Sequence, residues 1–262
     1  MMVGDEEYQK HTVFADLERY TAFYERLSIS VFQFVSVGTR AFCNIDSYLF
    51  SSVRGTLASI QAILRDGRIN DAYALLRKYY DSAIINIYTG LYLEDHISIE
   101  KFVVDQIDRW VQGKERLPEY RIMSQYIRQS PRVAPITALL HADDRYKRLR
   151  VRCNDHTHYN FYQNVLLNDN EIHLEGRGRA LDEFSNDLCD VLILHLSYMF
   201  FANGHYMMSS DHVDWLECGM TPEPDSQYWV APFVQEIFDE TVKRCRPDIA
   251  TTIRQHSSMH LA

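Results

Sequence analysis

The strongest constraint on this chain is a pair of apolar patterns at helical spacing that lie close together. Between residues 46 and 65, and again from 70 to about 94, apolar side chains recur every three or four positions, which places them on one face of a helix. Gly67 is the expected end of the first helix, and Asn70 can cap the second. Because the connection is short, the two helices are predicted to pack as an antiparallel hairpin. The apolar positions are Leu49, Val53, Leu57, Ile60 and Leu64, then Ala72, Leu76, Tyr79, Ala83, Ile87 and Leu91.

Few residues elsewhere in the chain interrupt helices. The 262 residues include only 10 Gly and 7 Pro, about half the usual share, which favours long helices over the many turns of an all-β domain. A very apolar segment from about 180 to 208 predicts a core helix, and His195 within it is expected to be buried and hydrogen-bonded. Other helices are predicted at about 12–37, from Ser98, from Pro118 to about 129, from Pro232 to 246, and from Pro247 to about 256.

One short segment departs from the helical pattern. Two apolar runs, 165–167 and 171–174, flank the turn-forming triplet 168–170 and predict a small β-hairpin that lies on the helices. The predicted fold is therefore an all-α multi-helix bundle with one small β-hairpin. Its predicted parts are an N-terminal helical segment (1–44), a helical bundle (45–210) and a C-terminal helical extension (211–262).

Charge and cysteine content restrict the kinds of partner. The formal net charge is −9, which argues against a generic DNA or anionic-membrane binder, so any nucleic-acid contact would be local. Five scattered cysteines without a Cys-x-x-Cys spacing predict free thiols in a reducing cytoplasm. The N-terminus lacks an apolar signal segment, and the most apolar run, Leu188 to Ala202, is too short to span a bilayer. A cytoplasmic protein with no membrane partner is expected.

The local exception in charge is the stretch from 145 to 164. Basic residues occupy five of its first eight positions, and a polar run with two histidines follows. On a helix, Arg150, Asn154 and His158 lie along one stripe, and the long Arg152 side chain starts about a third of a turn away. The basic residues are Arg145, Lys147, Arg148, Arg150 and Arg152, and the polar run contains Asn154, Asp155, His156, His158 and Asn160.

These side chains supply the groups that RNA cleavage without a metal needs. A base removes the 2′-hydroxyl proton, the freed oxygen attacks phosphorus, an acid protonates the leaving 5′-oxygen, and a cation stabilises the phosphorane. His158 can move the protons and Asn154 can orient its imidazole or bind a phosphate oxygen, while Arg150 or Arg152 can hold the phosphate. His156 faces another side of the helix, so His158 is the predicted acid and base.

The stretch resembles the signature of the HEPN superfamily, in which an Arg, usually followed by a polar residue, precedes a His with about four to six residues between them. Arg152 and His158 have five residues between them, and Asn154 precedes His158 by four. The run Leu-Leu-Arg-Lys-Tyr-Tyr-Asp at 75–81 is also similar to an upstream helix of some HEPN-like proteins. The likeness covers about residues 45–205.

The resemblance implies an all-helical domain of the kind found in toxins and phage-defence nucleases. Active members are homodimers in which two motifs meet across the interface in a metal-independent ribonuclease site. Other members have lost catalysis and serve as dimerising or RNA-binding modules. Cys153 stands directly after Arg152, where the family usually has a polar residue, which leaves open whether Arg150 or Arg152 is the motif arginine.

The predicted function is that of a metal-independent RNA endonuclease of toxin or anti-phage type. No cofactor or metal is expected, since the rings of His156 and His158 would point about 200° apart on a helix and chelate poorly. Expected partners are RNA, a second copy of the chain, and an antitoxin or defence-system protein. The alternative is a non-catalytic HEPN-like interaction module that dimerises or regulates a partner. The predicted catalytic residues are His158, Arg152, Asn154 and Arg150, and the predicted RNA contacts are Arg145, Lys147, Arg148 and Tyr162.

Overall fold

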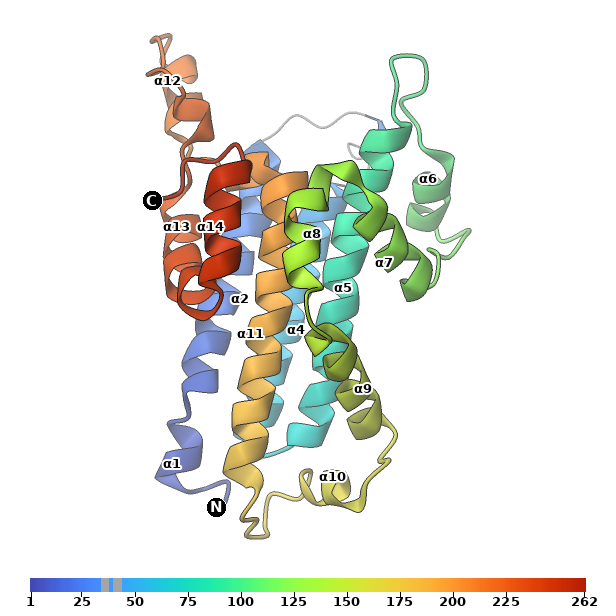
Figure 1. Ribbon diagram of the computed structural model, residues 1–262, viewed down its shortest axis with the longest axis vertical. Coiled ribbons are helices and arrows are strands. Elements are labelled where there is room, and N and C mark those ends of the chain that lie inside the picture. Colours follow the sequence, from blue (N-terminus) through green and yellow to red (C-terminus); the bar gives the residue numbers. More distant parts are fainter. Residues whose placement is uncertain (34–37, 40–43) are drawn as a thin grey trace.

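The computed structural model describes residues 1–33, 38–39 and 44–262, and these residues form an all-α protein (Figure 1). The predicted fold class is confirmed. The α-helices are α1 (Glu6–Gln9), α2 (Thr12–Ser30), α4 (Ile45–Arg65), α5 (Ile69–His96), α6 (Asp105–Val111), α7 (Tyr120–Gln129), α8 (Ala134–Leu140), α9 (Arg145–Thr157), α10 (Tyr162–Leu166), α11 (Arg177–Ala202), α12 (Asp211–Glu217), α13 (Pro232–Ile237) and α14 (Pro247–His256). Short 3₁₀ turns lie at Val31–Gln33, Pro131–Val133, Gly204–Met207 and Ser226–Tyr228, and Phe238–Lys243 (η5) is π-helical.

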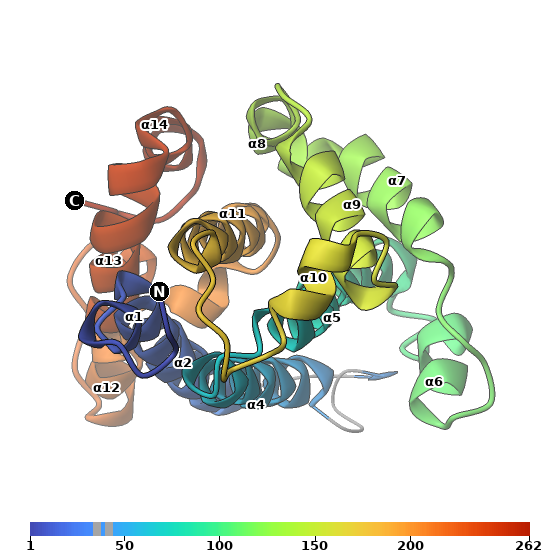
Figure 2. The same cartoon turned by 90° about the horizontal axis from the view of Figure 1, so that it is seen from below.

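Four long helices form the centre of the molecule. Helix α2 packs on α4, α4 on α5, α5 on α11 and α11 on α2, so the four surround a common core (Figure 2). Helices α4 and α5 are the predicted hairpin, and their observed bounds nearly coincide with the predicted ones. Gly67, between them, has a φ of 84°, a conformation that glycine adopts without strain and that commonly ends a helix.

The remaining helices cover this centre. Helices α7 and α9 pack on α5, and α8 and α14 pack on each other and on α11. Helix α11 therefore has neighbours on most of its sides, namely α2, α5, α8 and α14, which explains why its sequence is apolar nearly all round. Helix α12 projects from one end of the molecule (Figure 1).

A polar network crosses the core. Nδ1 of His195 lies 2.7 Å from the hydroxyl of Tyr24, and its Nε2 lies 2.9 Å from Oδ1 of Asn86. Burial lowers the pKa of His195 to about 3, so the imidazole is neutral. The expectation of a buried, hydrogen-bonded His195 is confirmed. The network continues through bonds between Tyr24 and Tyr79, Asn86 and Asp46, and Tyr206 and Asp46.

The predicted β-hairpin is wrong. Val165 and Leu166 end α10, and residues 168–176 form a loop. In that loop Oδ1 of Asp169 accepts bonds from the backbone N–H groups of two following residues, and the buried Arg177 donates to the carbonyl oxygens of Asp169 and Ile172. Those carbonyls are then not free for a strand ladder. Within the described ranges there are only isolated bridges, Met208 with Val230 and Trp229 with His260.

Several predicted helix bounds also shift. The helix expected from Ser98 begins at Asp105, because the preceding residues form an extended connection in which Thr39 Oγ1 accepts a bond from the Val104 N–H. The helix expected over 12–37 ends at Ser30, and part of that range lies outside the described residues. The helix expected to run to about 208 ends at Ala202, where a 3₁₀ turn follows.

The other expectations concern thiols, membranes and division into parts. Cys153, Cys189, Cys218 and Cys245 are free thiols, as predicted, and Cys43 lies outside the described residues. None of the helices in the described ranges combines the length and the apolar character that crossing a membrane requires. The hydrophobic core is continuous from α2 through α14, and the division at residues 44 and 210 stays a prediction.

Candidate functional site

Helix α9 carries the stretch that the sequence singles out. Its buried residues are Tyr146, Leu149, Cys153 and His156, spaced by three or four positions, and they fix the helix against α5. The rest of α9 is divided by this buried stripe into one side that faces α11 and another that faces α5 and α7. Each predicted site residue therefore belongs to one of two environments.

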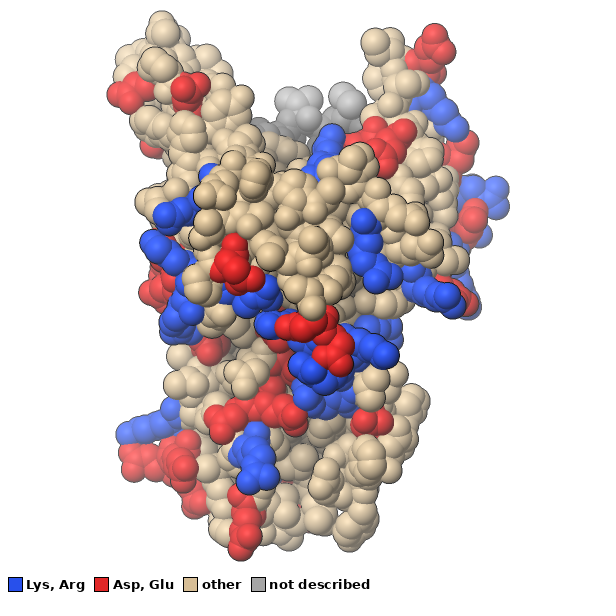
Figure 3. Space-filling view, viewed as in Figure 1, with Lys and Arg blue, Asp and Glu red and all other residues tan. Residues whose placement is uncertain are grey.

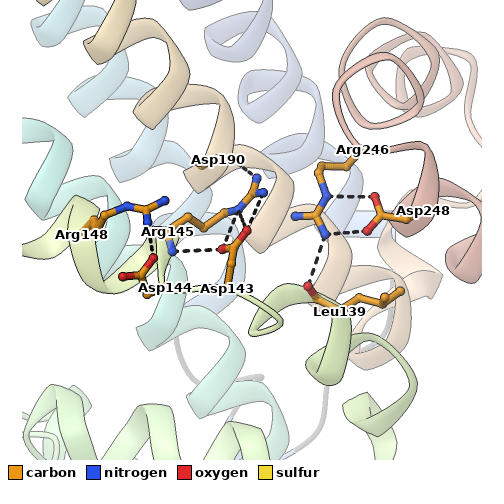
Figure 4. A network of polar contacts seen from close by, with 8 residues as sticks. All are labelled: Leu139, Asp143, Asp144, Arg145, Arg148, Asp190, Arg246 and Asp248. Atoms are coloured by element: carbon orange, nitrogen blue, oxygen red, sulfur yellow. Dashed lines mark hydrogen bonds and ion pairs between the residues drawn. The ribbon is translucent and has the colours of Figure 1, made fainter.

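The start of the basic run is neutralised by carboxylates (Figure 4). Arg145 donates through Nε and Nη2 to Asp143, at 3.0 and 2.8 Å, and through Nη1 to Asp190 at 3.0 Å. These hydrogen bonds lower the pKa of Asp143 to about 2. Arg148 is bonded to Asp144 one turn earlier. Two of the predicted RNA contacts, Arg145 and Arg148, thus already have anionic partners in the folded chain.

On the α11 side, Arg152 is held by two carboxylates. Its Nη1 donates to Asp187, and its Nη2 lies 2.8 Å from Oε1 of Glu183. Burial raises the pKa of Asp187 to about 6, although its bond to Arg152 acts in the opposite direction. Arg152 therefore ties α9 to α11, and the structure does not bring it to the side that carries Arg150 and Asn154.

His156 belongs to the buried stripe, lines the same hollow as Arg152 and is 5% exposed. Its Nδ1 is 2.9 Å from Oδ1 of Asn70, an acceptor, so the proton resides on Nδ1. Its ring is stacked on Tyr73, with 3.9 Å between ring centroids and an interplanar angle of 11°. Burial, with a smaller contribution from the charge of Arg152, lowers the pKa of His156 to about 4. This imidazole is neutral at pH 7.

On the α5 and α7 side, Arg150 and Asn154 lie together, as the helical spacing predicts. Nη1 of Arg150 donates to Asp81 at 2.6 Å, and its guanidinium lies over the ring of Tyr120, 3.2 Å from the centroid. Oδ1 of Asn154 accepts from Arg77 at 2.7 Å, and Arg77 also donates to Asp81 at 3.0 Å. One carboxylate therefore serves two guanidinium groups on this side.

His158 follows the last turn of α9. Its N–H donates to the carbonyl oxygen of Asn154 at 3.0 Å, so the helical path continues to this residue and extends the stripe of Arg150 and Asn154. Its side chain is exposed and has no hydrogen bond to any described residue. Tyr159, directly after it, has a φ of 50° and turns the chain away from the helix.

Hollows flank α9 on both sides. The first, which we call the α7/α9 pocket, has a volume of about 370 Å³. The second, the α9/α11 groove, consists of two hollows of about 360 Å³ each that share His156, Gln163, Asn164 and Glu183. The α7/α9 pocket is lined by Tyr80, Tyr120, Ser124, Arg128, His141, Tyr146, Lys147, Arg150, Val151 and Asn154.

The two hollows differ in charge. The α7/α9 pocket is lined by Arg128, Lys147 and Arg150, and none of the described residues that line it is a carboxylate. Burial lowers the pKa of His141 in its wall, which keeps that imidazole neutral. Over the α9/α11 groove, basic and acidic side chains alternate (Figure 3). The cations of the groove are Lys147, Arg148, Arg152 and Arg179, and its carboxylates are Asp144, Asp155 and Glu183.

The end of α9 and the start of α10 carry an exposed apolar patch. Tyr162, predicted to stack a base, is 76% exposed, and the described neighbours that share the patch are also exposed. Val151 and Phe161 line one hollow together, and exposed apolar side chains that adjoin one another mark interaction surfaces. The patch consists of Val151, Tyr159, Phe161, Tyr162 and Val165.

Other residues of the site were not predicted from the sequence. Arg77 and Asp81 are polar residues one turn apart in the predicted second helix, so helical spacing could have placed them on one face. Tyr120 and Arg128 gave no comparable signal. The partners on α11, Glu183 and Asp187, and Asn70 on α5 were missed because local spacing says nothing about distant contacts.

Of the two histidines weighed as metal ligands, His156 is bonded to Asn70, and His158 lies exposed after the end of α9. In residues 1–33, 38–39 and 44–262, no three His, Cys, Asp or Glu side chains are grouped so that they could hold a metal ion.

Comparisons with known proteins were made at three levels. No protein-family model, no curated protein and no solved structure matches this chain.

Proposed function

We propose that this protein is a metal-independent RNA endonuclease whose active side is the part of α9 that carries Arg150, Asn154 and His158. The observation that carries the proposal is the exposed imidazole of His158, which lies two turns beyond Arg150 and one turn beyond Asn154, the last residue of α9 that lines the α7/α9 pocket. The resemblance of the stretch to the HEPN signature supports ribonuclease chemistry, and it depends on the spacing of Arg152 and His158. Seven residues separate Arg150 from His158, so in this proposal Arg150 holds the phosphate without matching that spacing.

Each side chain has a distinct role in the proposed reaction. His158 accepts the 2′-hydroxyl proton, the 2′-oxygen attacks phosphorus, and the 5′-oxygen leaves with a proton, which gives a 2′,3′-cyclic phosphate. Arg150, held in place by Asp81 and Tyr120, donates to the phosphate oxygens. Lys147 and Arg128 add positive charge without a carboxylate in the same pocket. His156 is unsuited to this work because it is buried and neutral.

A second copy of the chain would complete the site. A single His158 must act as base and then as acid, whereas two copies would supply two imidazoles. Tyr159 and Tyr162 of the exposed apolar patch follow His158 closely in the chain and offer a surface for such a copy outside the α9/α11 groove. The proposed active form is therefore a homodimer, as the HEPN resemblance implies.

The experiment that tests the proposal is incubation of the purified protein with total RNA in the presence of EDTA. We expect fragments with 2′,3′-cyclic phosphate ends, and we expect His158→Ala to reduce their formation at least about 100-fold without changing the melting temperature. His256→Ala, an exposed histidine on α14, is the matched control and should cleave like the parent chain. Absence of cleavage by the parent chain at every pH from about 5 to 9 would reject the proposal.

The exposed apolar patch also favours a second candidate function, a non-catalytic interaction module. In that case Phe161→Ser and Tyr162→Ser would change the assembly state of the chain, and His158→Ala would change neither assembly nor any RNA. Light scattering on the three variants, together with the cleavage assay, separates the two functions.

A further inference from the structure

The α9/α11 groove gathers polar side chains of buried residues whose hydrogen-bonding groups the described residues leave partly unused. His156 uses Nδ1 for Asn70, and no described residue bonds to its Nε2, which is left as an acceptor. Asn164 is 4% exposed, and its side-chain amide has no hydrogen bond to a described residue. The hydroxyl of Tyr73, whose ring covers His156, is also buried without a partner among the described residues.

Most polar groups of buried residues in proteins have a hydrogen-bond partner. Unbonded groups that line a groove therefore indicate a place where a bound molecule can supply the partner. Here two of the three side chains, His156 and Asn164, line both hollows of the groove, where a bound molecule can reach them. A ligand could satisfy both side chains if it donates a hydrogen bond to Nε2 of His156 and both donates to and accepts from the amide of Asn164.

The charges of the groove favour an uncharged ligand. Arg152 is paired with Glu183 and Asp187, and Arg148 is paired with Asp144. The remaining cations of the lining, Lys147 and Arg179, lie in different hollows of the groove. The groove therefore lacks the excess of positive charge that distinguishes the α7/α9 pocket.

The walls of the groove favour a flat, partly apolar molecule. Phe161, which is 55% exposed, lines one hollow beside Val151, and three leucines line the other. An exposed aromatic ring is a stacking surface for a base, and side-chain amides pair with the hydrogen-bonding edges of bases. Gln163, next to Asn164, supplies a second amide to both hollows.

We propose that the α9/α11 groove is a binding site for a nucleobase, which stacks on Phe161 and is hydrogen-bonded by His156, Asn164 and Gln163. The base reaches the groove either as a free nucleoside or as part of a single strand. This site does not depend on the cleavage proposed above, because it lies on the other side of α9 and uses none of Arg150, Asn154 or His158.

The test is calorimetric titration of the intact chain with adenosine, guanosine, cytidine and uridine, and with D-ribose as the probe without a base. A short single strand of 2′-O-methyl RNA, which cannot be cleaved by 2′-hydroxyl attack, tests the second source. We expect saturable binding of at least one nucleoside or of the strand, no binding of ribose, and at least a tenfold loss of affinity in Asn164→Leu. If Asn164→Leu does not fold, Gln163→Leu, at an exposed position, replaces it as the test variant. Gln255→Leu on α14 is the matched control for Gln163→Leu.

A second measurement reads the imidazole directly. Binding of a base that donates to Nε2 should move the ¹⁵N resonance of that nitrogen in His156 and leave the resonance of His256 unchanged. Binding of the strand alone, with the same loss in Asn164→Leu, supports the site and identifies the strand as its source. Three results would overturn the proposal: equal binding by ribose, no binding by nucleoside or strand up to about 5 mM, or unchanged affinity in both amide variants. If water alone satisfies the polar groups of the groove, neither the nucleosides nor the strand will bind.

Discussion

The two sides of α9 hold similar residue types in opposite states. On the α11 side, Arg152 is fixed between two carboxylates and His156 is buried against Tyr73. On the α5 and α7 side, Arg150 shares a single carboxylate with another arginine, and His158 is exposed at the helix end. The comparison teaches that an arginine and a histidine at suitable spacing can be either part of the packing or open to a ligand. Burial and partners decide between the two.

The largest expected difference concerns the two arginines. Arg152→Met should lower the free energy of unfolding by about 3 kcal/mol, because it leaves the buried Asp187 without its cation. Arg150→Met should cost only about 1 kcal/mol, because Asp81 is half-buried and keeps its bond to Arg77. Urea denaturation of both variants measures the difference, and equal losses would show that the two sides of α9 are not distinct.

The two histidines should differ by a smaller amount. His156→Ala should lower the free energy of unfolding by about 2 kcal/mol, since it removes the bond to Asn70 and the stacking on Tyr73. His158→Ala should change it by less than about 0.5 kcal/mol, as is usual at exposed positions. The same denaturation experiment measures both, and a larger loss in His158→Ala would place that side chain in the packing.

The buried His156 should make the free energy of unfolding depend on pH. The pKa of His156 is about 4 in the folded chain and near its ordinary 6.5 in the unfolded chain, so between these values the unfolded state binds more protons. Stability from this group is therefore present above pH 6.5 and is lost as the pH falls towards 4. At pH 5 the loss should be about 1 kcal/mol once screening by solvent is allowed for.

Comparison with His156→Gln isolates this effect. Asp187, whose pKa is raised to about 6, contributes in the opposite sense, with stability that is lost as the pH rises through 6. Between pH 7 and pH 5, the melting temperature of the parent chain should therefore fall relative to that of the variant. The same change of melting temperature in both chains would contradict the lowered pKa of His156.

The smallest expected effect lies where α9 ends. Tyr159 has a φ of 50°, which side chains other than glycine adopt at a cost. Tyr159→Gly should raise the free energy of unfolding by about 0.5 kcal/mol, since relief of strain slightly exceeds the added freedom of the unfolded chain. A melting temperature raised by about 1–2 °C would agree, whereas a fall would show that contacts of the tyrosine ring outweigh the strain.

The regular part of the fold could be predicted from the sequence. Apolar spacing predicted α4 and α5 almost to the residue, Gly67 predicted the turn between them, and Pro232 and Pro247 predicted two helix starts. These features depend on local geometry and on one buried face. The hairpin could not be predicted correctly, because Arg177 takes the carbonyl oxygens of the loop and this contact depends on the tertiary fold.

The site could be predicted only in part. The shared side of Arg150 and Asn154 followed from helical spacing and is confirmed. The placement of Arg152 depends on Glu183 and Asp187, which are far along the chain and have no local signal. A local signal for the burial of His156 was present in the sequence, because His156 continues the spacing of Tyr146, Leu149 and Cys153. Catalysis by His158 stays a prediction.

The polar network in the core has a consequence for how the chain reaches its fold. Tyr24 and His195 lie 171 positions apart in the sequence, and Asp46 and Tyr206 lie 160 apart. His195 gains Tyr24 only when α2 and α11 have met, and Asp46 gains Tyr206 only when α4 has met the turn after α11, so these two bonds form late. Loop closure over such lengths is slow. We therefore expect collapsed, helical refolding intermediates in which the centre of the bundle is still hydrated, and single-step acquisition of the native interior thereafter.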